Sequence, residues 1–151
     1  MKELLEFLDK HKVDYRVENG KVIGKVVYLS NRWITELPKD IGLLECEWLD
    51  LYNNEITELP ISIGDIKCRR IYLNNNKIKE LPISIGNLIC SDIYLHYNNI
   101  PKSGIKYFDR IENLKNILTD YSDDLETIKQ LCISNTRKEK IDSILNRYLT
   151  I

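Results

Sequence analysis

The chain has 151 residues, of which 43% are hydrophobic and 30% are charged, and its formal net charge is −1. This length favours a single domain, and the nearly balanced charge gives no reason to expect nucleic acid or an anionic membrane as a partner. The sequence contains neither an apolar run long enough for a membrane span nor a signal-peptide core. We therefore expect a cytoplasmic, intracellular protein.

Residues 1–18 are expected to form an N-terminal cap. Four apolar residues lie near one side of a helix over residues 2–12, namely Leu4, Leu5, Phe7 and Leu8. The pair Asn19-Gly20 is a strong signal for a β-hairpin turn. An amphipathic membrane anchor is the alternative for the helix, although its apolar face is short and its charges are mixed. The segment is better suited to covering one end of the structure that follows.

Residues 27–104 hold four copies of one pattern, and the copies begin 22 residues apart. The two clearest copies read LDLYNNEITELPISIGDIKC (49–68) and IYLNNNKIKELPISIGNLIC (71–90). Looser copies begin at Val27 and Ile93. Self-similarity at a fixed period of this length is typical of a solenoid, in which equivalent coils stack on one another.

Each copy is predicted to contain one short strand and a return segment. Leu49 and Leu51 alternate around Asp50, which is the pattern of a strand with one buried face. Asparagines follow as at a turn, and Pro60 excludes a central strand for the segment after it. One copy cannot bury its apolar side alone, so the copies must stack.

One position of the repeat is occupied by Asn54, Asn76 and Asn98. A buried Asn has both donors and an acceptor, so it can satisfy backbone groups that no strand ladder reaches. We expect these side chains to form an internal hydrogen-bonded column. Arg32 holds the position in the first copy, which is therefore expected to be irregular.

The pattern L-x-L-x-x-N-x-I-x-x-L-P-x-x-I-G resembles the leucine-rich repeat family over about residues 21–104. The resemblance implies an α/β solenoid: a short right-handed coil with a parallel sheet on its concave side, usually used to hold another protein. Cysteines stand where the family more often has Leu, and Ser103-Gly104 replaces the Leu-Pro pair of the last copy. We therefore expect repeats over residues 19–104 and an end to the coil there.

Residues 105–151 are expected to form C-terminal helices. Apolar residues follow helical spacing at Tyr107, Phe108, Ile111, Leu114 and Leu118. Two further helices would begin at sequences that resemble capping boxes, Asp123 with Glu126 and Thr136 with Glu139. The first helix would close the core of the last repeat. The others could pack along the coil, form a small subdomain or mediate a homodimer.

Three of the four cysteines, Cys46, Cys68 and Cys90, share one repeat position. Stacking would place their Cα atoms about 5 Å apart, which a disulfide permits, whereas a column of thiols does not converge as tetrahedral zinc requires. An intracellular location also disfavours a disulfide. We expect reduced core residues well after each strand, towards the convex side, with a disulfide or a metal site as the alternatives.

Signals for catalysis are weak. The histidines are His11 and His96, and no nucleophile, phosphate-loop or metal-ligand motif accompanies them. An acidic residue precedes each Leu-Pro pair, at Glu36, Glu58 and Glu80. A solvated stripe is the expected role of these carboxylates, rather than paired catalytic groups. We predict no enzymatic activity, no cofactor and no metal.

The residues that alternate with the buried aliphatic side chains point out of the sheet and are rich in tyrosine. Aromatic residues that share one exposed face are typical of recognition surfaces, although tyrosine also simply suits strands. The predicted partner-binding residues are Tyr28, Trp48, Asp50, Tyr52, Arg70, Tyr72, Asn74, Asp92, Tyr94, His96 and Tyr97.

The sequence therefore predicts a non-catalytic scaffold that binds a protein or peptide on its concave sheet. An assembly module that dimerises through the C-terminal helices is the second hypothesis. A subunit of an enzyme complex is the third.

Overall fold

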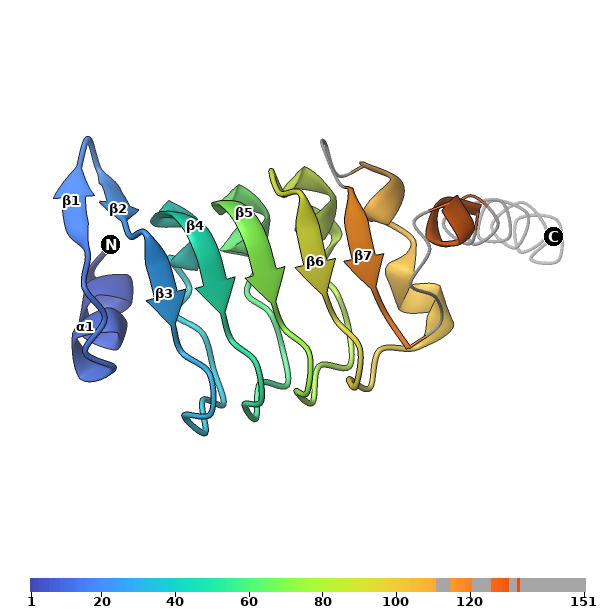
Figure 1. The fold of residues 1–151 in the computed structure, drawn as a ribbon, viewed down its shortest axis with the longest axis horizontal. Coiled ribbons are helices and arrows are strands. Elements are labelled where there is room, and N and C mark those ends of the chain that lie inside the picture. Colours follow the sequence, from blue (N-terminus) through green and yellow to red (C-terminus); the bar gives the residue numbers. More distant parts are fainter. Residues whose placement is uncertain (111–114, 121–125, 131–132, 134–151) are drawn as a thin grey trace, which may run out of the picture.

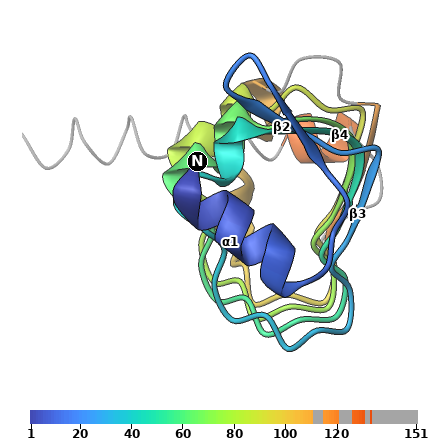
Figure 2. The same ribbon diagram turned by 90° about the vertical axis from the view of Figure 1, so that its left-hand side faces the viewer.

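The computed structural model describes residues 1–110, 115–120, 126–130 and 133. The chain forms a row of stacked coils, and each coil contributes a strand to one sheet (Figure 1). Viewed along the stack, the sheet lies on one side of the coils and short 3-10 helices lie on the other (Figure 2). This arrangement is a solenoid-like fold built on a mostly parallel sheet.

The sheet is parallel except for one hairpin. Its strands follow the order β1-β2-β4-β5-β6-β7, and β3 also pairs with β4. The antiparallel pair is β1 (Arg16–Glu18) and β2 (Lys21–Ile23), joined at the predicted Asn19-Gly20 turn. The parallel strands are β3 (Val26–Tyr28), β4 (Leu44–Asp50), β5 (Lys67–Tyr72), β6 (Asp92–Tyr94) and β7 (Asn116–Leu118).

The interval of the repeat sets the register of these strands. Val27 pairs with Leu49, Leu49 with Ile71, and Ile71 with Ile93. All four side chains are fully buried. Because the apolar residues recur at equal offsets, each copy places them over those of the next, and one continuous core results. The predicted stacking of the copies into a mostly parallel sheet is confirmed, although β4 and β5 begin before the predicted triplets.

The return side of each coil is a 3-10 helix: η1 (Ile41–Leu43), η2 (Ile61–Asp65), η3 (Ile83–Asn87) and η4 (Lys102–Ile105). Neighbouring helices pack very closely. A Cβ atom added to Gly64 would lie 2.0 Å from the carbonyl oxygen of Ser84, and one on Gly42 would lie 2.4 Å from that of Ser62. Glycine at this repeat position therefore lets adjacent coils reach their packing distance.

The predicted asparagine column joins neighbouring coils. The Nδ2 atom of Asn76 donates to the carbonyl oxygens of Leu51 and Leu73, both at 3.0 Å. Its Oδ1 atom accepts from the backbone N–H of Ile56 at 3.1 Å. Leu51 and Ile56 belong to the preceding coil, so the side chain bridges two coils through their backbones. Asn54 and Asn98 make equivalent bonds.

Other residues take the asparagine position at the two ends of the column. The Nη1 atom of Arg32 donates to the carbonyl oxygen of His11 at 2.8 Å. At the far end, the Asp120 carboxylate accepts from the backbone N–H groups of Tyr97 at 2.6 Å and Asn98 at 3.3 Å. The first copy is therefore irregular, as predicted, and the column ends on a carboxylate.

Helix α1 (Lys2–Lys10) lies across the first coil (Figure 2). Its Leu4 and Leu8 side chains are fully buried and belong to the same core as the repeats. The backbone N–H of Lys39, at the turn before η1, donates to the Glu3 carboxylate at 3.1 Å. The predicted helix is present, and its apolar residues pack where the sheet begins.

The prediction of one helix through residues 107–118 is wrong over its described part. Phe108–Arg110 forms a single 3-10 turn, η5, and Asn116–Leu118 is the strand β7. Ile117 is fully buried and pairs with Ile93, 24 residues earlier, so the sheet extends beyond residue 104. Widely spaced apolar residues fit this turn and strand as well as they fit a helix. Residues 126–130 are helical, and most of the other predicted helical residues lie outside the described residues.

Candidate functional site

The two faces of the sheet differ in burial. Leu49 and Leu51 are fully buried in the core, whereas Trp48 and Asp50 are half-buried and Tyr52 is exposed. We term the outer surface of the parallel strands the sheet face. The predicted partner-binding residues other than Tyr97 belong to it, because strand alternation turns every second side chain outward.

One row of the sheet face contains Tyr28, Asp50, Tyr72 and Tyr94, which are paired in register across four strands. The rings of Tyr72 and Tyr94 stack with 4.6 Å between their centroids and 12° between their planes. Tyr28 is exposed at the other end of the row. Burial and the neighbouring Tyr72 raise the pKa of Tyr94, so the Tyr94 ring stays neutral at pH 7.

A second row contains Trp48, Arg70, Asp92 and Asn116, also in register. The Arg70 guanidinium lies 5.5 Å from the centre of the Trp48 ring, and its Nε donates to the Asp92 carboxylate at 2.9 Å. The Nδ2 atom of Asn116 donates to the other carboxylate oxygen at 2.6 Å. The four side chains of the row are therefore linked one to the next, by a cation–π contact and then by two hydrogen bonds.

The Asp92–Arg70 pair is held in its charged form. Burial alone would raise the pKa of Asp92, but the hydrogen bonds from Asn116 and Arg70 lower it below its usual value. The hydrogen bond to Asp92 raises the pKa of Arg70 in turn. Asp92 is only 5% exposed, so this carboxylate is not free to meet a partner. Its burial comes from neighbouring strands and is not visible in its own sequence.

The third row follows the ends of the strands and contains Tyr52, Asn74 and His96. Asn74 is 9% exposed, and within the described part of the chain neither its Oδ1 atom nor Nδ1 of His96 has a hydrogen-bond partner. The backbone N–H of Asn75 donates to the carbonyl oxygen of His96 at 3.1 Å, which keeps the two segments side by side. Two unpaired polar atoms therefore lie at this end of the sheet face.

Tyr97 lies in the turn beside the sheet face. Its φ is positive at 57°, and φ is also positive for the residues at the equivalent position of the other coils, Asn31 (58°), Asn53 (52°) and Asn75 (57°). Asn tolerates this left-handed conformation, but an aromatic residue seldom adopts it. The Tyr97 ring is 70% exposed and packs edge-on against His96, with 4.9 Å between centroids.

Trp33 is an exposed aromatic residue that was not predicted as a binding residue. It has a positive φ of 57° and is 81% exposed. The other copies carry Glu55, Lys77 and Asn99 at its position, so an aromatic residue among polar ones was the available signal. Asn116 was also missed, because β7 follows β6 at a longer interval than the repeat.

The predicted placement of the repeat cysteines is wrong. Cys46 and Cys68 lie inside β4 and β5, where they are directly paired, and not well after the strands on the convex side. Cys68 and Cys90 are buried, whereas Cys46 is half-buried. The strands begin several residues before the Leu-x-Leu triplets by which the copies were recognised, and this offset explains the error.

The remaining candidates for chemistry do not converge. Glu36, Glu58 and Glu80 are exposed. Among the described residues, no three His, Cys, Asp or Glu side chains gather closely enough to hold a metal ion. No helix in the described part of the chain is long and apolar enough to cross a membrane.

Comparison with known families agrees with this architecture. Residues 45–66 and 67–88 each match the family model described as Leucine Rich Repeat. No curated protein matches the chain. Residues 45–88 are therefore two successive leucine-rich repeats, and their strands pair in register in the parallel sheet. Such repeats commonly mediate protein–protein interactions and are generally non-catalytic.

Proposed function

We propose that the protein is a non-catalytic scaffold that binds a protein or peptide partner through the sheet face. The observation that carries the proposal is the stacked pair Tyr72 and Tyr94 at one end of the row Tyr28, Asp50, Tyr72 and Tyr94. Tyr28 and Tyr52 add exposed ring surface beside it. Tyrosine offers a large, rigid contact area at low entropic cost, which is why it is enriched in binding hot spots.

The charges on the sheet face favour a polypeptide partner over a nucleic acid. Arg70 and Asp92 neutralise each other, and the Asp50 carboxylate accepts from the backbone N–H of Tyr52 at 3.0 Å. The sum over these three residues is −1 (one positive and two negative charges). Such a surface cannot attract a phosphate backbone. Apolar side chains of a polypeptide would instead lie against the tyrosine rings.

Affinity capture from the native cell, followed by calorimetric titration of the purified partner, tests the proposal. Tyr72→Ala with Tyr94→Ala should weaken binding by about 2–4 kcal/mol, the range of hot-spot truncations. The matched control is Glu58→Ala with Glu80→Ala, which changes two exposed residues of adjacent coils away from the sheet face. The control should bind like the parent.

Stability must be measured in parallel because the two tyrosines are half-buried and stacked. Losing the stack should cost about 0.5–1.5 kcal/mol beyond the lost burial, which a double-mutant cycle in denaturant measures. Equal affinity of the tyrosine variant and the parent, with the fold intact, would contradict the assignment of the sheet face. A greater loss in the glutamate control would do the same.

A further inference from the structure

The cysteine position of the repeat brings two thiols together at the beginning of the sheet. Cys46 of β4 and Cys68 of β5 are direct partners in the parallel ladder, and their Sγ atoms are 3.4 Å apart. Both cysteines, like Cys90 one coil further on, are free thiols.

The backbone geometry permits a covalent bond between these two sulfurs. Paired residues of adjacent strands lie about 4.7–4.9 Å apart along the hydrogen-bonding direction, within the Cα–Cα range of about 4.4–6.8 Å found for disulfides. Paired residues also direct their side chains to the same face. The sulfurs need to close from 3.4 Å to about 2.05 Å, a movement that side-chain rotation and small backbone shifts supply.

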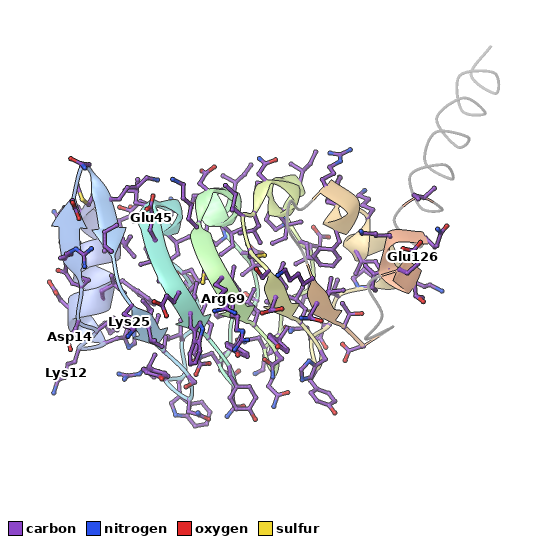
Figure 3. All side chains as sticks on the ribbon, turned by 45° about the horizontal axis from the view of Figure 1, so that its top comes forward. Lys12, Asp14, Lys25, Glu45, Arg69 and Glu126 are labelled. Atoms are coloured by element: carbon purple, nitrogen blue, oxygen red, sulfur yellow. The ribbon has the colours of Figure 1, made fainter. Side chains whose placement is uncertain are left out.

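A small reagent can reach the pair. A hollow of about 420 Å³ is lined by Cys46, Cys68 and Cys90 together with Lys67, Arg69, Ile89 and Ser91. Cys46 also lines a second hollow, of about 490 Å³, beside Glu45 and Lys25. In the side-chain view, Glu45 stands near the beginning of β4 and Arg69 projects from β5 (Figure 3). The two cysteines therefore border a hollow whose lining also includes the polar side chains of Lys67, Arg69 and Ser91.

The three thiols differ in chemistry. The Cys46 thiol donates to Cys68 Sγ, and the Cys68 thiol donates to the carbonyl oxygen of Arg70 at 2.9 Å. The hydrogen bond from Cys46 lowers the pKa of Cys68, whereas burial and the neighbouring Cys68 raise the pKa of Cys90 to about 12. Because the thiolate is the reactive form and Cys90 has no thiol paired opposite it in the ladder, oxidation should join Cys46 to Cys68 and spare Cys90.

We propose that Cys46 and Cys68 form a dithiol site that hydrogen peroxide converts to an interstrand disulfide within one chain. The thiolate of one of the two cysteines attacks one peroxide oxygen, the O–O bond breaks, and the departing hydroxide takes up the proton that the thiol released, which forms water. The resulting sulfenic acid is attacked by the sulfur of the other cysteine, which forms the S–S bond and releases a second water. Two thiols are oxidised, and one peroxide is reduced to two waters.

The test is peroxide treatment of the folded chain, with Cys132→Ser as background so that three thiols remain. Free thiols are then alkylated in denaturant. Cleavage before aspartate and after basic residues leaves Cys46, Cys68 and Cys90 on separate peptides for mass spectrometry. We expect loss of two free thiols, a Cys46–Cys68 crosslink and an alkylated Cys90. Oxidation of Met1, which is 41% exposed, reports the peroxide dose.

Cys90→Ser is the matched control, and it should form the crosslink at the parental rate. Cys46→Ser should instead accumulate sulfenic acid on Cys68, which dimedone traps. The folded parent alone decides the main result, so a variant that fails to fold does not obscure it. Three intact thiols after Met1 is fully oxidised would overturn the proposal. A crosslink to Cys90, or one that joins two chains, would overturn it as well.

Discussion

Asn76 illustrates how much of the structure depends on a single side chain. It is 7% exposed, and the carbonyl oxygens and the N–H that it binds belong to buried coil segments. Asn76→Ala should lower the free energy of unfolding by about 1–3 kcal/mol for each buried group left unpaired. Chemical denaturation measures the change.

Asn98→Ala is the control for this prediction, because Asn98 makes the same bonds but is half-buried. Water can replace part of its bonding, so its loss should cost less. Equal costs at the two positions would show that burial does not set the energy of the column.

Asp92 should make stability depend on pH in acid. Its pKa is lowered in the folded chain relative to the ordinary value of 3.8, so its contribution is present above that value. It is lost as the pH falls through the lower folded pKa, because the folded state must then protonate a bonded carboxylate. Asp92→Asn should flatten the acid limb of a stability-versus-pH curve below about pH 3.8. An unchanged limb would mean that other carboxylates dominate acid unfolding.

At the scale of elements, the packing of 3-10 helices determines how closely the coils approach. Gly64→Ala would place a Cβ 2.0 Å from a backbone oxygen, which has no soft side chain to move aside. Overpacking of this kind typically costs about 1–3 kcal/mol and sometimes more. Gly86→Ala is the matched variant, since its Cβ would come no closer than 3.1 Å to its nearest neighbours, the Cβ of Arg110 and the carbonyl oxygen of Tyr107. The thermal unfolding midpoint of Gly64→Ala should therefore lie well below that of Gly86→Ala.

The strands were predictable because Leu49, Ile71 and Ile93 recur at one interval and fix both burial and register. The last strand was not, because Ile117 follows at a longer interval and after a copy that lacks the Leu-Pro pair. The repeat interval predicts strand positions only in the part of the chain where successive copies keep that interval. The residues around Phe108 do not repeat the pattern of the earlier copies. Their apolar residues match helical spacing by chance.

The outward orientation of the sheet-face side chains was predictable, and their contacts were not. Strand alternation correctly turned Tyr72, Tyr94 and Arg70 outward. The burial of Asp92 and Asn74 depends on residues of neighbouring strands, and Asn116 was not known to be one of these. Likewise, the pairing of Cys46 with Cys68 could be predicted only by knowing where β4 and β5 begin. Both strands begin before the triplets that reveal the repeat.

For the whole molecule, the open ends of the stack are the places where core side chains would meet water. At the first coil, α1 buries Leu8 completely. Leu8→Ala should therefore destabilise the entire stack by about 2–5 kcal/mol, as truncations of buried leucine do. Leu5→Ala, at a half-buried position of the same helix, should cost clearly less in the same denaturant titration. Equal effects would show that α1 does not close the core through Leu8.

The asparagine column also bears on how the molecule comes apart. A side chain bonded to its own coil and to the one before it cannot be released by opening a single coil, because both backbones would lose partners. We therefore expect the middle coils to melt as one cooperative block. Within the described residues, Arg32 and Asp120 stand at the two ends of the column, and we expect fraying to begin there. Native-state hydrogen exchange should then show protection that rises from the ends of the stack towards its middle.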